Sequence, residues 1–247
     1  MILYKFMGLT PFERVADALL GRRLYCPMPR ELNDPFEGML GNHAEGAEAG
    51  KPLDDQLRAG IKNMLYTDQD LDRARVCCFS ESPQSMQMWS YYTGGHKGIC
   101  LEVDVSEFAS KITKVKYVDD TESLRSMRPV DRLPYKHSTW QHEQEFRLIT
   151  IDEPSREWLP IVIKAVLIST SMDLSFILPI HELCRHLMLP IEIASFSTHG
   201  KLTRFLWNSS VPFYSRLACT GPSGALSIPA QHAAATGDER PQADARA

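Results

Sequence analysis

The chain has 247 residues, of which 43% are hydrophobic and 23% are charged, and its formal net charge is −4. This composition is that of an ordinary globular protein, which excludes disorder along the whole chain. A slightly negative chain has no overall electrostatic attraction for nucleic acid or for an anionic membrane, although a local basic patch would be compatible with these numbers.

The apolar stretches of the sequence are too interrupted or too short for a signal peptide or a membrane span. Lys5, Glu13 and Arg14 interrupt the N-terminal apolar residues, whereas a signal peptide has an uninterrupted apolar core. The most apolar later stretch, residues 158–168, contains Pro160 and falls short of the roughly 20 residues that span a bilayer. We therefore expect a cytoplasmic protein without a membrane partner.

The start of the chain predicts two short apolar strands on either side of a helix. The strands are residues 3–6 and 23–26. Between them, Thr10 and Glu13 have the spacing of a capping box, and Pro11 suits the first position of a helix. Gly21 predicts a left-handed end to this helix.

The rest of the chain alternates short strands with irregularly placed helices. Apolar runs and two-residue alternation predict strands at 75–79, 98–103, 112–118, 146–151, 161–168, 191–194 and 204–207. Helices are expected at 54–66, from Ser82 to Gly94-Gly95, and at 180–188 after Pro179. This order predicts a single α+β domain over residues 1–215 rather than a regular βαβ array.

Two segments are expected to lack regular structure. Residues 41–52 are rich in Gly, Ala and Glu and predict a surface loop. Residues 219–247 turn to Gly, Pro, Ala, Ser, Gln and Asp without periodicity, so they cannot bury enough apolar surface to fold. We expect them to form a disordered tail.

The spacing of the cysteines and histidines argues against a metal site. The six cysteines include the adjacent Cys77 and Cys78 but no C-x-x-C spacing, which disfavours a zinc or redox site. In His181-Glu182-x-x-x-His186 the second histidine comes one residue too late for a zinc-binding helix, because the two rings would lie about 140° apart around the axis. We expect no metal.

The segment 140–147, Trp-Gln-His-Glu-Gln-Glu-Phe-Arg, carries the most informative polar residues. If a strand begins near Glu143, its two-residue period places Glu143, Glu145 and Arg147 on one face. One carboxylate of such a pair can activate a nucleophile while the other stabilises positive charge, and the arginine can hold a carboxylate ionised or bind a phosphate. The alternative is a solvated strand face with a Glu–Arg ion pair.

Two further segments carry candidate residues. His96 lies between glycines that leave room for a close backbone approach, so it could bind a phosphate or act as an acid or base. The alternative there is a helix C-cap followed by an exposed basic turn. Asn33 and Asp34 precede Pro35, and such residues most often serve the turn itself, with ligand binding as the alternative.

The candidate segments form an ordered set of motifs. They are Tyr-Lys-Phe at 4–6, Leu-Asn-Asp-Pro-Phe-Glu at 32–37, Cys-Phe-Ser-Glu at 78–81, Met-Trp-Ser-Tyr-Tyr at 88–92, His-Lys-Gly at 96–98 and Trp-x-x-Glu-x-Glu-x-Arg at 140–147. The set resembles the bacterial domain-of-unknown-function family numbered twenty-nine seventy-one. Family members usually have His at the position of Tyr91 and a Gly-Pro-like pair near Ser169-Thr170. The resemblance implies kinship and names no activity.

A second, fainter similarity concerns the order of three strand motifs. In ADP-ribosyltransferase-like proteins a basic first strand is followed by a Ser-bearing middle strand and then by a late Glu-bearing strand. The same order is found here in Leu3-Tyr4-Lys5, Phe79-Ser80-Glu81 and Glu143-x-Glu145. Lys5 stands where those proteins have Arg or His. The similarity implies an ADP-ribosyltransferase-like split sheet, with NAD as substrate and no metal.

This similarity also implies roles for the candidate residues. Glu145 would stabilise an oxocarbenium-like ribosyl centre, and Glu143 would activate the acceptor. Tyr4 or Tyr92 would stack on the nicotinamide ring. The groups expected to hold the pyrophosphate are Lys5, His96 and Arg147. Such an enzyme would transfer ADP-ribose or hydrolyse NAD, as a bacterial toxin or defence effector does.

Two other functions remain open from the same residues. A metal-dependent nuclease effector, which cuts nucleic acid, would use the carboxylates Asp34, Glu37, Glu143 and Glu145. A non-catalytic module that binds a nucleotide or another small molecule would form its pocket from Trp89, His96 and Arg147. Magnesium-dependent cleavage would favour the first function, and tight binding without turnover would favour the second.

Overall fold

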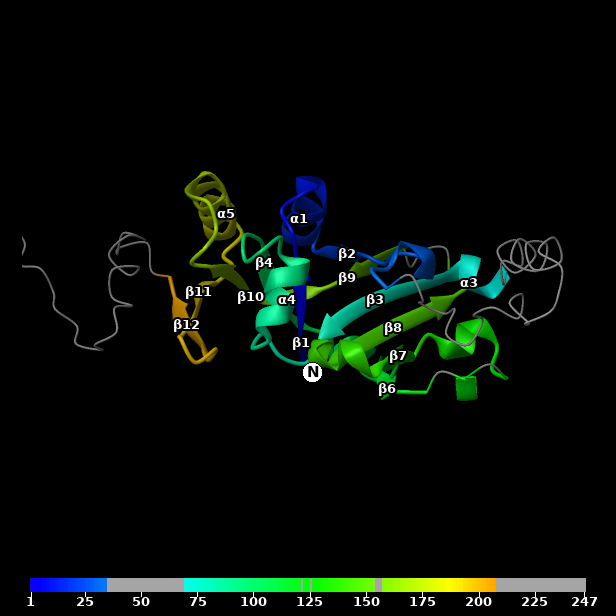
Figure 1. Cartoon of the computed structure of the whole chain (residues 1–247). Coiled ribbons are helices and arrows are strands. Elements are labelled where there is room, and N and C mark those ends of the chain that lie inside the picture. Colours follow the sequence, from blue (N-terminus) through cyan, green and yellow to red (C-terminus); the bar gives the residue numbers. More distant parts are fainter. Residues whose placement is uncertain (35–68, 121, 125, 154–156, 208–247) are drawn as a thin grey trace, which may run out of the picture. The chain divides into compact units, whose positions relative to one another are not determined.

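The computed structural model describes residues 1–34, 69–120, 122–124, 126–153 and 157–207 (Figure 1). These residues form one compact unit. Its main strands are β1 (Ile2–Met7), β3 (Ala74–Ser80), β4 (Ile99–Asp104), β5 (Ile112–Lys114), β8 (Glu145–Ile151), β10 (Val162–Ser169), β11 (Ile191–Phe196) and β12 (Leu202–Leu206). They form an eight-stranded sheet in the order β12-β11-β10-β4-β1-β3-β8-β5.

Smaller elements surround this sheet. Two short strand pairs are β2 (Arg23–Tyr25) with β9 (Trp158–Pro160), and β6 (Lys116–Val118) with β7 (Tyr135–His137). The α-helices are α1 (Phe12–Leu19), α3 (Gln69–Arg73), α4 (Met86–Tyr92) and α5 (Leu174–His186). The 3-10 helices are η1 (Pro29–Glu31), η2 (Ser106–Phe108), η3 (Glu122–Leu124), η4 (Pro129–Arg132) and η5 (Ser138–Glu143).

The strand directions establish the fold class. Within the described sheet, β10 and β11 pair in parallel, and the other neighbouring strands pair antiparallel. The helices are placed irregularly along the chain and are not regular crossovers between parallel strands. The predicted α+β class is therefore confirmed. No helix among the described residues is long and apolar enough to cross a membrane.

The sheet divides where β1 meets β3. Tyr4 and Ser80 are the one pair in register between these two described strands, whereas β1 pairs with β4 over six residues and β3 pairs with β8 over seven. In Figure 1, β3 and β8 lie side by side while β1 crosses the end of β3. The sheet thus has two parts, β12-β11-β10-β4-β1 and β3-β8-β5, which join at one pair of residues.

Helix α4 is fixed against β1 by a buried tryptophan. Trp89 is fully buried, and its ring meets the ring of Phe6 edge to face with 5.5 Å between the centroids. Its Nε1 donates a hydrogen bond of 2.9 Å to the carbonyl of Pro83, so the one polar atom of the ring is satisfied. This packing holds the last turn of α4, which carries Tyr92, beside the junction of β1 and β3.

Two glycines and a serine define the ends of α4. Ser85, rather than the predicted Ser82, caps the helix by accepting a hydrogen bond from the backbone N–H of Met88. Gly94 and Gly95 both have left-handed backbone conformations, so the predicted end of this helix is confirmed. The chain then returns directly into β4.

Helix α1 differs from its prediction at both ends. It begins at Phe12 with Pro11 at the N-cap and no side-chain cap, so the predicted capping box of Thr10 and Glu13 is wrong. Gly21 is not left-handed, and Arg22, with a φ of 51°, takes that conformation instead. Glycine is nevertheless required at 21, because a Cβ there would lie 2.6 Å from a carbonyl oxygen of the helix.

Other boundaries were also shifted. Helix α5 begins at Leu174 and contains Pro179, which was predicted to begin it; this proline lies in the second turn, where it has no backbone N–H to donate to the carbonyl of Ser175. The predicted strand 112–118 is broken at the buried Val115 into β5 and β6. The predicted helix 54–66, the loop 41–52, the tail 219–247 and Glu37 lie outside the described residues.

Candidate functional site

A cavity of about 190 Å³ lies where the two parts of the sheet separate. Residues of β1 form one wall, residues of β3 form another, and Tyr92 of α4 and Glu143 of η5 lie between them. The described residues that line it are Tyr4, Lys5, Phe6, Pro27, Glu31, Leu32, Asn33, Cys78, Phe79, Ser80, Met88, Tyr92, Lys136, Glu143 and Glu145. Aromatic and apolar groups thus surround a small number of charged groups, as in many ligand sites.

The backbone between η5 and β8 brings two carboxylates into this cavity. Gln144 ends η5 in a left-handed conformation, and β8 begins at the next residue. The Ser80 hydroxyl donates a hydrogen bond of 2.8 Å to the carbonyl of Glu143, and the backbone N–H of Glu145 donates one of 2.9 Å to the Tyr117 hydroxyl. Both glutamates are therefore held from the backbone as well as through their side chains.

Arg147 fixes the carboxylate of Glu145. Its Nε and Nη2 each donate a hydrogen bond of 2.8 Å to a different carboxylate oxygen, which is the bidentate arrangement. A third donor, Nη1, reaches the carbonyl of Leu133 at 2.6 Å. Arg147 is fully buried and does not line the cavity, so it supports Glu145 from behind.

Lys136 of β7 contacts both carboxylates. Its Nζ lies 2.7 Å from an oxygen of Glu143 and 3.4 Å from an oxygen of Glu145. It also lies 4.7 Å from the centre of the Trp140 ring, a cation–π arrangement. Only 3% of the Lys136 residue is exposed, so water does little to screen these interactions.

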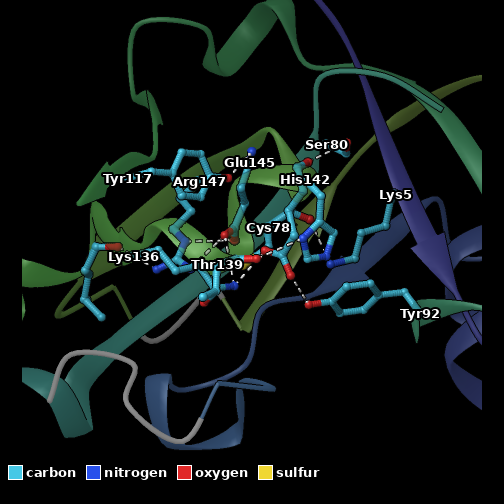
Figure 2. Close-up of polar contacts among 12 residues, drawn as sticks. Lys5, Cys78, Ser80, Tyr92, Tyr117, Lys136, Thr139, His142, Glu145 and Arg147 are labelled. Atoms are coloured by element: carbon cyan, nitrogen blue, oxygen red, sulfur yellow. Dashed lines mark hydrogen bonds and ion pairs between the residues drawn. The ribbon is translucent and has the colours of Figure 1, made fainter. Parts of the chain in front are cut away.

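Tyr92 contacts Glu143 from the opposite direction. Its hydroxyl donates a short hydrogen bond to Oε1, the oxygen that Lys136 does not take. Figure 2 shows Arg147 and Lys136 on one side of Glu145 and Tyr92 on the other.

The two carboxylates have different protonation properties. Burial would raise the pKa of Glu145, but the charges of Arg147 and Lys136 bring it down to about 2. Burial raises the pKa of Glu143 above its ordinary value, and the charge of Lys136 opposes this increase without cancelling it. Glu145 therefore stays ionised at neutral pH, whereas Glu143 is the carboxylate that exchanges a proton more readily.

Neighbouring phenols and thiols are held in their neutral forms. Burial, followed by the charge of Glu143, raises the pKa of the Tyr92 hydroxyl. Burial and the nearby Glu145 raise the pKa of the Cys78 thiol well above its ordinary value. A neutral Cys78 is a poor nucleophile, so the carboxylates are the more reactive groups of the cavity.

Lys5 places a second cation at the separation of the two strands. Its Nζ donates a hydrogen bond of 2.9 Å to the carbonyl of Cys78, on the part of β3 that no longer pairs with β1. An ammonium group has three donors, and this backbone carbonyl takes one of them. Lys5 is half-buried and lines the cavity, so it can contact an anionic group of a ligand.

The structure brings together six of the ten residues singled out from the sequence. Those that line the cavity are Tyr4, Lys5, Asn33, Tyr92, Glu143 and Glu145. Those that do not line it are Asp34, Trp89, His96 and Arg147. Asp34 is buried, and Glu37, which was named for the nuclease alternative, lies outside the described residues.

Trp89 and His96 belong to a packed aromatic group away from the carboxylates. The two rings are parallel with 6.5 Å between their centroids, and Phe196 of β11 meets both edge to face. The backbone N–H of His96 donates to the carbonyl of Trp89, and the left-handed turn that carries His96 leads into β4. Their place in the fold fits a structural role at the end of α4.

The Glu–Arg pair was expected on a strand face, and it differs from that expectation in two ways. Glu143 precedes the strand, which begins at Glu145, so these two are not neighbours on one strand face. All three residues of the motif are buried, which excludes the solvated face that was the alternative interpretation. The ion pair between Glu145 and Arg147 is present, but inside the protein.

Sequence reasoning missed Lys136. It lies on a three-residue strand in the segment Tyr-Lys-His, which has no motif and no clear periodicity. Its ammonium group is nevertheless the cation that touches both carboxylates. The one available signal was its position shortly before the Glu-x-Glu segment, and such proximity is too common to be informative.

No metal-binding cluster occurs in the described part of the chain: nowhere there do three or more His, Cys, Asp or Glu side chains converge. The carboxylates of the cavity are instead bound by Lys136 and Arg147. Comparisons of the chain with models of known families, with curated proteins and with solved structures found no match. The family resemblance of the motifs thus stays a prediction.

Proposed function

We propose that the chain is an NAD-handling enzyme that breaks the bond between nicotinamide and ribose and passes ADP-ribose to water or to another acceptor. The observation that carries this proposal is the pair of carboxylates that line the cavity, Glu145 bound through both oxygens by Arg147 and Glu143 bound by Lys136 and Tyr92. Burial and these contacts together leave the pKa of Glu145 lowered and that of Glu143 raised. Neighbouring acids with separated pKa values are typical of sites where one group stabilises charge and the other transfers a proton.

Glu145 would act on the ribosyl centre. As the bond between C1′ and the nicotinamide nitrogen breaks, its electron pair goes to the nitrogen, and positive charge develops on the ribose. A permanent carboxylate stabilises that charge, and it is more effective inside a protein than in water. Arg147 holds Glu145 in place and keeps it ionised, which is a positioning role.

Glu143 would act on the acceptor. The acceptor oxygen forms a bond to C1′ and gives its proton to the Glu143 carboxylate, which later releases that proton to water. The products are nicotinamide, ADP-ribosylated acceptor and one proton. Tyr92 fixes the orientation of Glu143 by donating a hydrogen bond to one of its oxygens.

The remaining lining residues suit a nicotinamide ribosyl group. Tyr4, Phe6 and Tyr92 provide aromatic rings against which nicotinamide packs. Lys5 provides a cation for a phosphate. At about 190 Å³ the cavity is smaller than the roughly 300–1,000 Å³ of pockets for drug-sized ligands. The proposal therefore places only the nicotinamide end of NAD inside it.

The test is release of nicotinamide from NAD by the purified protein, with Glu143→Gln as the main variant. The glutamine keeps the size of the side chain and loses the base, so we expect release to fall at least about 100-fold. Glu107→Gln, which changes an exposed glutamate of η2, is the matched control and should match the wild type. Equal turnover by wild type and Glu143→Gln would contradict the proposal.

The alternatives predict different results in the same assay. A binding module would bind NAD or a related nucleotide and release no nicotinamide. A metal-dependent nuclease would cleave nucleic acid in the presence of magnesium and would release no nicotinamide. We place the proposed enzyme in the cytoplasm, where NAD is present. The identity of its acceptor would decide whether it acts as a toxin or as a defence effector.

A further inference from the structure

We infer that Lys136 is a positioning residue: by placing its ammonium group against both carboxylates, it keeps Glu143 able to accept a proton during the reaction. This inference rests on the proposed function. It adds a residue that touches no reacting atom in that mechanism and acts through Glu143. Its evidence is the position of Nζ, 2.7 Å from Glu143 and 3.4 Å from Glu145.

The shorter of the two distances shows that Lys136 pairs mainly with Glu143. Glu145 has a cation of its own, because Arg147 binds both of its oxygens at 2.8 Å. Of the described side chains that hydrogen-bond to the Glu143 carboxylate, Lys136 is the one that carries a positive charge. The charges thus form two pairs, and both carboxylates can be ionised together without leaving net charge in the interior.

Other groups that face Glu143 do not replace this cation. Tyr92 on α4 donates a hydrogen bond but stays neutral, and Glu145 on β8 is a like charge that favours protonation of Glu143. Other charged or titratable groups that the structure describes near the pair lie on the cavity wall or beside Glu145; they include Tyr4 and Lys5 on β1, Glu31 on η1, Cys78 on β3 and Tyr117 on β6.

Burial makes this arrangement necessary. Only 2% of Glu143 is exposed, and a buried carboxylate without a cation takes up a proton and becomes neutral. A protonated Glu143 cannot act as the base for the acceptor. Lys136 would therefore extend the range of pH over which Glu143 is ionised down to more acidic values.

The first experiment measures nicotinamide release from NAD against pH for the wild type and for Lys136→Met, which keeps the length of the side chain and removes its charge. We expect the acidic limb of the profile to move by about 1 to 3 pH units towards alkaline pH, because a nearby opposite charge lowers a carboxyl pKa by that amount. Lys136→Arg keeps the charge and should move the limb less.

A merely structural role predicts a different result. In that case Lys136→Met would lower the melting temperature and the rate at every pH, and the limb would stay at the wild-type pH. That outcome would overturn the inference. Lys111→Met, at an exposed lysine between η2 and β5, is the control for loss of a positive charge and should leave the profile unchanged.

A second measurement needs neither turnover nor a variant that folds. The 15Nζ resonance of Lys136 in the wild type should shift as Glu143 titrates, with the same midpoint as the side-chain carboxyl 13C resonance of Glu143. Different midpoints would overturn the inference. A common midpoint without nicotinamide release would instead support the coupling of Lys136 to Glu143 and reject the proposed function, so the two failures are distinguishable.

Discussion

Arg147 binds Glu145 through two parallel hydrogen bonds of 2.8 Å, and neither residue has significant contact with water. Breaking such a pair leaves a buried charge without a partner, and this costs about 3–5 kcal/mol. We therefore expect Arg147→Met to lower the free energy of unfolding by about that amount in urea titrations. Glu145→Gln should also destabilise the fold, because it removes the charge with which Arg147 is paired.

The control for Arg147→Met is an exposed pair with the same separation. Arg185 and Glu182 of α5 also lie 2.8 Å apart, but more than half of each side chain is exposed. Water screens that pair, so Arg185→Met should change the free energy of unfolding little. Equal effects of the two variants would show that burial does not determine the contribution of the Glu145–Arg147 pair.

The stability of the protein should decrease at acidic pH because of Glu145. Its pKa is about 2 in the folded protein and about 4.5 for an ordinary glutamate, so folding favours the ionised form. The resulting stabilisation, on the order of 3 kcal/mol, is present above about pH 4.5 and is lost as the pH falls towards 2. Urea unfolding of the wild type and Glu145→Gln between pH 6 and 3 would measure it, and the variant should show the weaker dependence.

Tyr92→Phe should show how much the orientation of the Glu143 carboxylate, as distinct from its charge, contributes to nicotinamide release. The variant keeps the aromatic ring of the cavity and removes the hydroxyl that donates to Glu143. A hydrogen bond to a charged group contributes about 1.5–3 kcal/mol, so a loss of that size is expected in the free energy of unfolding. Nicotinamide release should fall by less than in Glu143→Gln, because the base remains; an equal fall would contradict an orienting role for Tyr92.

Gly98→Ala should be strongly destabilising. A Cβ at this position would lie 2.1 Å from the carbonyl oxygen of Met7 and 2.9 Å from the side chain of Thr93, and the backbone of β1 cannot move away without breaking its pairing with β4. Overpacking of this kind costs about 1–3 kcal/mol or more. Gly8→Ala is the control, since its nearest contact would be an ordinary 3.8 Å, and thermal unfolding would compare the two.

The local pattern of the sequence was informative wherever neighbours along the chain determine the structure. Apolar runs predicted the central strands, for example β3 and β4, because strands buried on both faces consist of consecutive apolar residues. The period of two also predicted that Glu145 and Arg147 share a face, and their ion pair confirms it. Helix starts were less predictable, since Thr10 had the right spacing for a cap but the structure does not use it.

Contacts between distant segments could not be predicted from local patterns. Lys136 and Tyr92 reach Glu143 from β7 and α4, and nothing in the spacing of the chain relates these elements to η5. Trp89 and His96 were predicted to lie in the site, and the structure places them outside the cavity. They are close in sequence to Tyr92, which lines the cavity, but Trp89 is fully buried in the core and His96 stacks on its ring.

The one pair in register between β1 and β3 has a mechanical consequence. Most neighbouring strands of the sheet resist a change of angle through several hydrogen bonds, whereas these two are joined in register at Tyr4 and Ser80 alone among their described residues. A small rotation about that point would change the width of the cavity while leaving the ladders of β1 with β4 and of β3 with β8 intact. The hydrogen bond from Lys5 on β1 to Cys78 on β3 connects the two strands beside this point, so its length would change with the angle between them.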